Sequence, residues 1–206
     1  MFSPLIQKLI MALQYLPGVG PKSAQRIAFH LLTKSANTKG LALAQSLQSA
    51  ISQVRECQLC QIYTEQHLCD ICCDPKRNSA LLCVVEGPSD VVAIEQTRVY
   101  SGRYFVLQGR LSPLDGIGPQ EIKIPILLDR LREESITELI IATNATVEGK
   151  ATAHYIVNHT DRAKIRCSRI AHGIPIGGEL EYLDGGTLSH AFRSRVPIEN
   201  LEFNKG

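Results

Sequence analysis

Apolar residues recur at steps of three and four positions through the first quarter of the chain, which predicts three amphipathic helices. The first is expected to begin near Pro4, because Ser3 can cap a helix and proline suits its first turn, and to continue to about Leu16. The second is expected over residues 22–33 and the third over about residues 41–55. We expect the third helix to pack on the first two through the apolar residues Leu43, Leu47, Ala50, Ile51 and Val54.

From residue 80 onward the pattern changes to short apolar runs that alternate with helical segments. The expected strands cover residues 80–85, 104–107, 138–142 and 164–170. The expected helices cover about residues 90–96, 124–134 and 150–158. Strands that alternate with helices are typical of an α/β domain with a mainly parallel sheet, in which functional residues gather beyond the carboxyl ends of the strands.

The sequence therefore predicts a chain of several modules that combines α+β and α/β folds. Its 206 residues, 44% of them hydrophobic, suffice for one sizeable domain and a small one. The expected modules are a helical module over residues 1–55, a cysteine module over residues 56–78, an α/β domain over residues 79–175 and a closing segment over residues 176–206. We expect the closing segment to serve packing or contact between subunits.

The turn between the first two predicted helices reads LPGVGPKSAQR. Gly18 and Gly20 permit positive φ and let a foreign backbone approach, while Pro21 suits the first position of the second helix. Free amides at that helix end, with Lys22 and Arg26 beside them, form a candidate phosphate site. The alternative is a helical hairpin whose glycines only make the turn. The stretch resembles the helix-hairpin-helix of DNA-binding proteins, which holds the sugar-phosphate backbone without reading sequence.

Charge is distributed unevenly along the chain. Residues 1–55 hold six Lys or Arg and no Asp or Glu, a formal charge of +6, whereas the remainder carries −4 and the whole chain +2. A basic head on a mildly acidic body favours a polyanion as partner, although a solvated helical face without acids is the alternative. Phe29 shares the helical face of Lys22 and Arg26, where it either stacks on a base or packs against a neighbour.

Cysteines between residues 57 and 73 have the spacing of a metal site. Two C-x-x-C pairs separated by eight residues can close a tetrahedral zinc shell, which has no open position and therefore serves structure. A disulfide framework would need an oxidising compartment, for which nothing in the sequence argues. Cys73 in place of Cys72, and His67 as a further ligand, are the alternatives. The expected ligands of one Zn²⁺ per chain are Cys57, Cys60, Cys69 and Cys72.

Two predicted strands end in polar residues that would meet at one edge of the sheet, in VVEG and in ATNAT. A strand ending in Glu-Gly, with a later strand ending in Asp-x-Asp, resembles the Toprim domain of topoisomerases and primases, whose carboxylates hold Mg²⁺ for phosphoryl chemistry. Glu86 matches the glutamate, but Asn144 and Thr146 stand where the aspartates belong. The resemblance implies a Toprim frame without its metal chemistry. The alternative is a Mg²⁺-dependent phosphoryl-transfer enzyme such as a primase, topoisomerase or nuclease.

Taken in order, these motifs resemble the RecR family of bacterial recombination mediators nearly from end to end. The most specific stretch is YSGRYFVLQGRLSPLDGIGP, and it is followed by ATNATVEGKATAHYI and GIPIGGELEYLDGGTLSHAF. The resemblance implies a protein without catalytic activity that assembles into ring-like clamps, with a tetramer as the suggested assembly. It also implies that the protein works with RecO and RecF to load RecA onto single-stranded DNA.

The same resemblance assigns roles to particular residues. Lys22 and Arg26, at the hairpin that contains Gly18 and Gly20, would contact single-stranded and duplex DNA without sequence preference. An acidic residue of the Toprim region contacts RecO in the family, and Glu148 is the candidate here. The alternative for Glu148 is a carboxylate at a helix start, where the helix dipole favours it.

Several other function classes find no support in the sequence. No apolar run approaches membrane-spanning length and no signal peptide is recognisable, so we expect a cytoplasmic protein that associates with the nucleoid through DNA. No G-x-x-x-x-G-K-[ST] occurs, so the loosely Walker-B-like stretch from Glu179 to Asp184 does not predict ATP hydrolysis. A zinc-bearing scaffold that never meets nucleic acid is disfavoured by the acid-free N-terminal segment.

Overall fold

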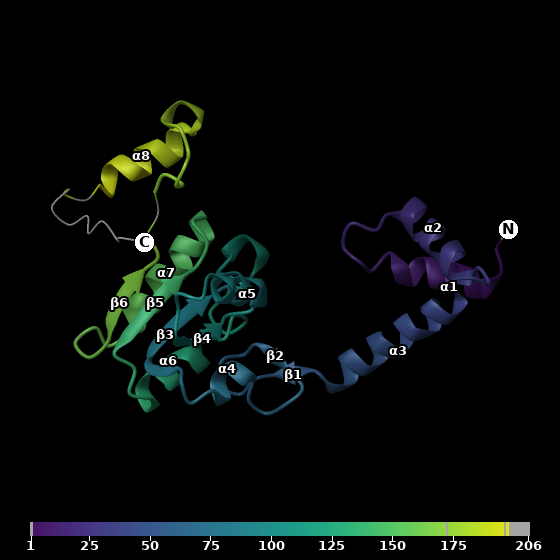
Figure 1. Cartoon of the computed structure of the whole chain (residues 1–206), viewed down its shortest axis with the longest axis horizontal. Helices are drawn as coiled ribbons and strands as arrows, with labels where there is room; N and C mark the ends of the chain where they lie inside the picture. The colour runs from purple at the N-terminus through teal and green to yellow at the C-terminus, as the bar shows by residue number, and fades with distance from the viewer. Residues whose placement is uncertain (1, 172, 196, 198–206) are drawn as a thin grey trace. The chain divides into compact units, whose positions relative to one another are not determined.

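The computed structural model describes residues 2–171, 173–195 and 197 (Figure 1). The chain divides into two compact units, residues 1–55 and residues 56–206. The end of the predicted closing segment, residues 198–206, lies outside the described residues. No helix within the described ranges is long and apolar enough to cross a membrane.

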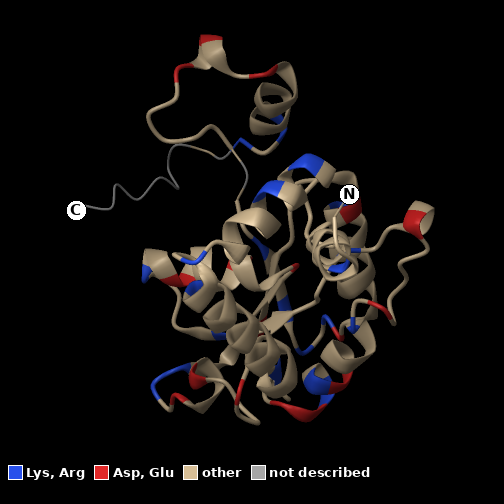
Figure 2. Ribbon diagram, turned by 90° about the vertical axis from the view of Figure 1, so that its right-hand side faces the viewer, with Lys and Arg blue, Asp and Glu red and all other residues tan. Residues whose placement is uncertain are grey.

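The first unit contains the helices α1 (Pro4–Leu13), α2 (Pro21–Leu32) and α3 (Asn37–Gln53). α1 and α2 pack against each other, and α2 buries Ala24 and Ala28 completely. Because alanine side chains are small, helix backbones can approach closely at these positions. The unit carries six Lys or Arg and no acidic residue. Figure 2 marks the basic and acidic residues along the described chain in blue and red. The predicted pair of helices joined by a tight turn is therefore present.

The third helix differs from its prediction. It begins at Asn37, before the expected residue 41, and approaches α2 near its start, where a Cβ on Gly40 would lie 3.4 Å from the carbonyl oxygen of Leu31. The larger apolar residues that were expected to pack on the first two helices are 39–82% exposed. They are Leu43, Leu47, Ile51 and, just beyond the end of the helix, Val54. The prediction that this face packs on the first two helices is wrong, because an amphipathic pattern indicates that a face is buried without saying what covers it.

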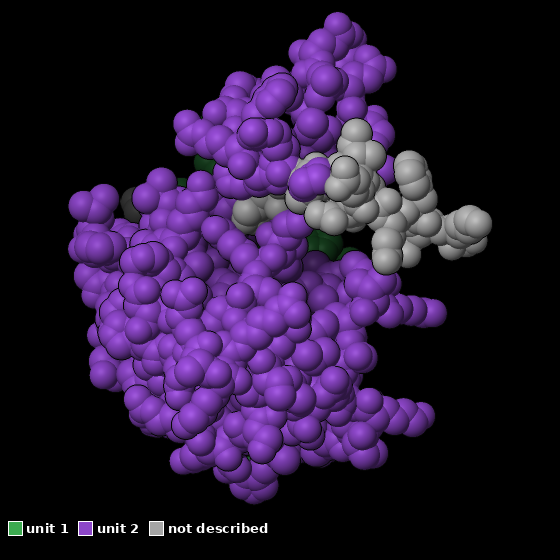
Figure 3. All heavy atoms as spheres, turned by 90° about the vertical axis from the view of Figure 1, so that its left-hand side faces the viewer, with its two compact units in different colours: residues 1–55 green, residues 56–206 purple. Residues whose placement is uncertain are grey.

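The second unit, purple in Figure 3, is built on a parallel sheet of β3 (Asn78–Val85), β4 (Gly102–Val106), β5 (Glu138–Ala142) and β6 (Arg166–Arg169). The strand order is β4-β3-β5-β6. Leu82 pairs with Leu139 and Val85 with Ala142, so the carboxyl ends of β3 and β5 lie side by side. The predicted parallel sheet is confirmed, and β5 has its predicted bounds.

Helices cover both faces of this sheet: α5 (Pro88–Thr97) on one face, α6 (Ile124–Glu133) and α7 (Val147–His159) on the other. Successive side chains of β3 point to opposite faces of the sheet, as in any β-strand. Leu82 and Val84 pack in the core beneath α6 and α7. Cys83 and Val85 pack with Val91 of α5. The continuous apolar run of β3 thus reflects burial on both faces.

A charged network fastens α5 to the sheet. Arg77 pairs with Glu95 of α5 and donates to the carbonyl oxygen of Tyr100 at 3.3 Å. The hydroxyl of Tyr104 donates to Glu95 Oε1 at 2.6 Å. The pairing with Arg77 lowers the pKa of Glu95, so the carboxylate stays ionised while it anchors the helix.

Short elements complete the second unit: β1 (Arg55–Glu56), β2 (Tyr63–Thr64), α4 (Asp70–Cys73), two 3₁₀ turns (Pro113–Asp115 and Leu180–Tyr182) and α8 (Gly185–Arg193). Asp184 caps α8, since its carboxylate accepts from the amide of Thr187 at 2.9 Å and from its hydroxyl at 2.5 Å. These bonds from Thr187 lower the pKa of Asp184. The acid that ends the Walker-B-like stretch is therefore occupied as a helix cap.

Candidate nucleic-acid interface and metal centre

The turn before α2 is shaped by its glycines. Gly18 has φ +78°, a left-handed conformation that favours glycine, and the amide of Val19 closes the turn on the carbonyl oxygen of Leu16 at 3.1 Å. Gly20 is extended and caps α2 without a side chain. A Cβ on Gly18 or Gly20 would meet no protein atom within 4 Å. The space in front of both residues is therefore open to an approaching partner.

Backbone amides and cations meet at this helix end. In the described chain, no hydrogen bond is donated by the amides of Gly20, Lys22 or Ser23, as expected at a helix start without a side-chain cap. Lys22 and Arg26 are exposed, lie on one face of α2 and take part in no ion pair of the described residues. Free amides, the positive end of the dipole and two unpaired cations together suit a phosphate group.

Phe29 has a partner within its own unit. Its ring meets Phe2 edge to face with 5.1 Å between ring centroids, and 38% of the residue is exposed. This contact favours packing over base stacking, the two roles that the sequence left open for Phe29.

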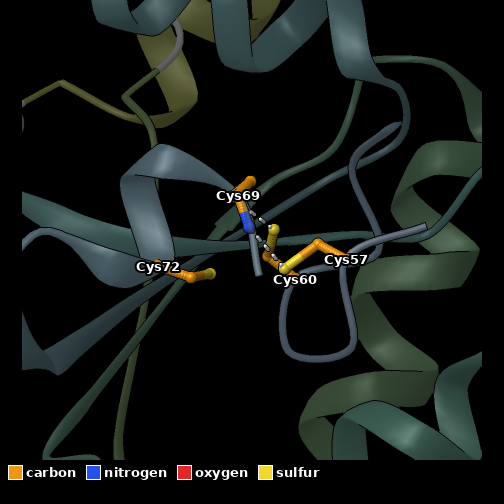
Figure 4. Close-up of side chains that lie close together, drawn as sticks. All are labelled: Cys57, Cys60, Cys69 and Cys72. Atoms are coloured by element: carbon orange, nitrogen blue, oxygen red, sulfur yellow. Dashed lines mark hydrogen bonds between the residues drawn. The ribbon is translucent and has the colours of Figure 1, made fainter. Parts of the chain in front are cut away.

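Four cysteines converge in the second unit (Figure 4). Their ligand atoms all lie within 4.8 Å of one another, and Cys60 Sγ is 3.4 Å from Cys69 Sγ. Two thiolates bound tetrahedrally to one Zn²⁺ at about 2.3 Å are about 3.8 Å apart, so the spacing fits a single ion. The buried set is Cys57, Cys60, Cys69 and Cys72. These four residues could therefore hold a metal ion with no position left open for a substrate.

Charge also favours a cation at this cluster. Hydrogen bonds from Cys60 and Cys72 lower the pKa of Cys69 to about 2. Hydrogen bonding with Cys69 raises the pKa of Cys60 to about 12, and bonding with Cys60 and Cys69 raises that of Cys72. A cation bound among the four sulfur atoms would favour their thiolate forms.

The two alternative ligands lie outside the cluster. Cys73 is exposed, and its thiol lies 3.9 Å from the carbonyl oxygen of Leu68. His67 is exposed, and its Nδ1 lies 3.4 Å from the side-chain amide of Gln58. The geometry favours the two C-x-x-C pairs over either substitute.

A buried arginine joins the cysteine module to the sheet. Arg130 of α6 is 6% exposed, and its guanidinium donates to the carbonyl oxygens of Leu59 and Tyr104, both at 2.9 Å. Its Nε donates to Glu134 at 2.9 Å. The sequence alone did not predict a role for this residue. The available signal was a cation next to Leu131 on the apolar side of a predicted helix.

The contact between module and sheet is continued by main chain and apolar side chains. The amide of Val106 donates to the carbonyl oxygen of Cys60 at 2.8 Å, next to the end of β4. Ile62 and Ile71 pack both against the cysteine cluster and against the core beneath α5. The cysteine module and the core beneath α5 therefore share both main-chain and side-chain contacts.

Replacing Arg130 by methionine is expected to lower the free energy of unfolding by about 3–5 kcal/mol, because two buried carbonyl oxygens and Glu134 lose their donor. Denaturant unfolding measures this loss. Arg132→Met is the matched control: its side chain is 70% exposed, and Asp129 is its one ion-pair partner among the described residues, so a change within about 1 kcal/mol is expected. Equal losses in the two variants would show that the buried bonds contribute nothing.

The edge of the sheet that holds Mg²⁺ in Toprim enzymes is built differently here. Both carboxylate oxygens of Glu86 accept from Asn144, from its amide at 2.8 Å and its side chain at 2.7 Å. Thr146 caps α7, accepting from the amide of Gly149 at 3.1 Å. At the two positions where Toprim enzymes have aspartates, this chain therefore has Asn144, which donates hydrogen bonds to Glu86, and Thr146, which caps a helix. Mg²⁺ prefers a near-octahedral set of oxygen ligands, so these residues do not fit it.

Glu148 lies in the first turn of α7, beside Val147, which is 80% exposed. Glu148 is half-buried and forms no ion pair with any described residue. This position of Glu148 agrees with both interpretations of the residue: contact with a protein partner, and a carboxylate that the helix dipole stabilises at the start of α7.

Known proteins match this chain over nearly its whole length. Residues 6–51 match the family described as RecR, helix-hairpin-helix, residues 80–171 match the Toprim domain, and residues 173–196 match the family described as RecR, C-terminal. Recombination protein RecR of Coxiella burnetii is 76% identical over 200 residues, 97% of this chain and 100% of that protein. Recombination protein RecR of Saccharophagus degradans is 57% identical over 198 residues, 96% of this chain and 100% of that protein.

Fold and site together define a protein that joins a helix-hairpin-helix, a four-cysteine cluster able to bind a metal ion, and a Toprim domain. The predicted fold class is confirmed. The chain belongs to the RecR family of recombination proteins, as its motifs indicate.

Proposed function

We propose that the chain is a non-catalytic, DNA-binding mediator of recombinational repair. The observation that carries the proposal is the open end of α2, where unpartnered amides adjoin the exposed Lys22 and Arg26. The groups there recognise phosphate and none is arranged to read a base, so binding is independent of sequence and extends to single-stranded and duplex DNA. The names of the relatives, recombination proteins, agree with this role.

The remaining modules have supporting roles in this proposal. Residues 1–55 bind DNA, residues 56–78 hold one structural Zn²⁺, residues 79–175 present a surface to a protein partner, and residues 176–206 serve contact between subunits. Zinc fits the cysteine module because four buried sulfur ligands at tetrahedral spacing suit that ion.

Assembly into a ring is the second part of the proposal. A compact chain of this length has a radius of gyration of about 17 Å and cannot encircle a duplex alone, so a clamp needs several copies in closed symmetry. Exposed apolar residues support association: Leu5 is 78% and Ile51 82% exposed, and neither α1 nor α3 contains a buried residue. The family resemblance supplies the copy number, a tetramer.

The resemblance also supplies the proposed partners. RecO would bind near Glu148, and together with RecO and RecF the clamp would promote loading of RecA onto single-stranded DNA. The half-buried carboxylate of Glu148, which has no ion-pair partner in the described chain, and the exposed Val147 beside it support a protein contact at this place.

Absence of catalysis is the part of the proposal that is most easily tested. The chain lacks the paired aspartates of a Toprim enzyme, and Asn144 occupies both oxygens of Glu86. We expect purified protein, incubated with labelled DNA and RNA in millimolar Mg²⁺, neither to cleave, join nor extend the strands, while it still retards them on a gel. Steady turnover that disappears in a Glu86→Gln preparation would instead establish the alternative, a Toprim phosphoryl-transfer enzyme; turnover insensitive to that change would indicate a contaminant.

A further inference from the structure

The carboxyl ends of β3 and β5 are joined by one buried side chain. Glu86 is 7% exposed, and its Oε1 and Oε2 accept from the main-chain and side-chain nitrogens of Asn144 at 2.8 and 2.7 Å. Arg110 stands 3.9 Å from Oε2 and is half-exposed. The glutamate is therefore satisfied by protein groups alone, with a guanidinium as its nearest countercharge.

The segment that follows β5 is fastened at further points. The hydroxyl of Thr143 donates to the carbonyl oxygen of Gly149 at 2.9 Å, and the amide of Gly149 donates to Thr146 at 3.1 Å. A Cβ on Gly149 would lie 2.2 Å from the carbonyl oxygen of Asn144 and 2.8 Å from Glu86 Oε1. The first turn of α7 is thus in direct contact with the Glu86–Asn144 pair, and only glycine permits this approach.

The polarity of this site is the reverse of what a magnesium site needs. A metal site would direct several oxygen atoms toward a common centre. Here the side-chain amide of Asn144 directs hydrogens at Glu86, and the hydroxyl oxygen of Thr146 is engaged as a helix cap. The strand ends that a metal would bridge are bridged by two hydrogen bonds.

We propose that Glu86 and Asn144 form a metal-independent clamp that has replaced the Toprim magnesium site and that positions residues 143–149. Glu86 is a positioning residue in this arrangement. It acts through Asn144 on the first turn of α7, which carries Glu148. The inference goes beyond the proposed function, because its test involves neither DNA nor a protein partner and its outcome does not depend on theirs.

The test is a set of three variants whose melting temperatures are compared in magnesium-free buffer. Asn144→Asp places two carboxylates against each other and is expected to lower the melting temperature by roughly 5 °C or more. Glu86→Gln is expected to lower it by less, because the Asn144 side chain can turn its amide over and accept from the glutamine, which replaces a charge-assisted bond by a neutral one. In the double variant the glutamine amide donates to the aspartate, and this variant is expected to regain at least half of the loss seen in Asn144→Asp.

A magnesium titration of the same proteins separates a clamp from an ordinary structural contact. Wild type and the double variant are expected to melt at the same temperature with and without millimolar MgCl₂ at matched ionic strength. Asn144→Asp is expected to be stabilised by Mg²⁺, because its paired carboxylates now attract the ion. Glu133→Gln is the matched control; it removes the same charge from an exposed side chain and is expected to melt like wild type.

Three results would overturn the clamp. They are a Mg²⁺-dependent rise in the wild-type melting temperature that Glu86→Gln abolishes, a double variant no more stable than Asn144→Asp, and an Asn144→Asp protein as stable as wild type without Mg²⁺. Should Asn144→Asp not fold in magnesium-free buffer, recovery of folding in the double variant supports the clamp and failure of both contradicts it.

Discussion

Cys57→Ser is expected to release the metal and unfold the cysteine module. A serine hydroxyl is a poor zinc ligand, and the binding free energy of structural zinc, about 10–16 kcal/mol in finger peptides, is comparable to the stability of a whole domain. Apart from its bonds to the sheet, the module has little of its own to hold it, since its cluster consists of the four cysteines and a few partly buried side chains. We expect the sheet to survive, because its larger core beneath α6 and α7 contains none of these residues.

The measurements are zinc content, the thermal melt and limited proteolysis mapped by mass spectrometry. Cleavage is expected to appear within residues 56–76, together with a lower melting temperature, because Ile62 and Ile71 cease to cover the core beneath α5. Cys73→Ser is the matched control, since Cys73 is exposed and outside the cluster. A Cys57→Ser protein that melts and resists protease like wild type would disprove a structural metal.

Lys22→Ala and Arg26→Ala are expected to weaken DNA binding by roughly tenfold each, since each removes a charge-assisted contact worth about 1.5–3 kcal/mol. The loss should be the same for oligonucleotides of unrelated sequence, because a phosphate contact carries no sequence information. Fluorescence anisotropy with two unrelated single strands and two duplexes measures it. Both side chains are exposed and unpaired with acids in the described chain, so neither change should alter the thermal melt.

Lys34→Ala/Lys39→Ala provides the matched control for the double variant. It removes the same charge from the same unit, at exposed positions beyond the other end of α2. The twelve residues of α2 separate its open end from Lys34 by about 18 Å, and Lys39 lies in the next helix. If the control loses as much DNA affinity as the Lys22 and Arg26 variants, binding depends on net charge and not on the open helix end. If the Lys22 and Arg26 variants lose affinity for only one oligonucleotide sequence, these residues read bases.

The elements that carry a strong local signal were predictable from sequence. The apolar runs of β3 and β5 arise because helices cover both faces of the sheet, and the period-3.6 stripes of α2 and α6 arise because one side of each helix is buried. Each pattern can therefore be read without knowing which segment covers the buried residues. The metal centre was predictable for a similar reason: two C-x-x-C turns bring their thiolates together wherever they lie in the fold.

Contacts between distant segments were not predictable in the same way. Arg130 bonds to the carbonyl oxygens of Leu59 and Tyr104, and the Glu86–Asn144 clamp joins strands far apart in sequence. A carbonyl oxygen of the main chain can belong to any residue type, so the sequence does not reveal which carbonyls Arg130 reaches. Asn144 in place of an aspartate indicated that metal binding is lost, but it did not indicate that Asn144 bonds to Glu86. The prediction for the apolar face of α3 failed because an amphipathic pattern does not say whether anything within the same chain covers that face.

The salt dependence of DNA affinity tests the central claim, that the open end of α2 binds the nucleic-acid backbone, most directly. The slope of log affinity against log salt counts phosphate contacts, at about 0.7 per contact for single strands and about 0.9 for duplex. Lys22→Ala/Arg26→Ala is expected to flatten the slope by at least about 1.4 on a single strand, while Lys34→Ala/Lys39→Ala leaves it unchanged. A slope that stays at the wild-type value in the first of these variants would contradict the claim.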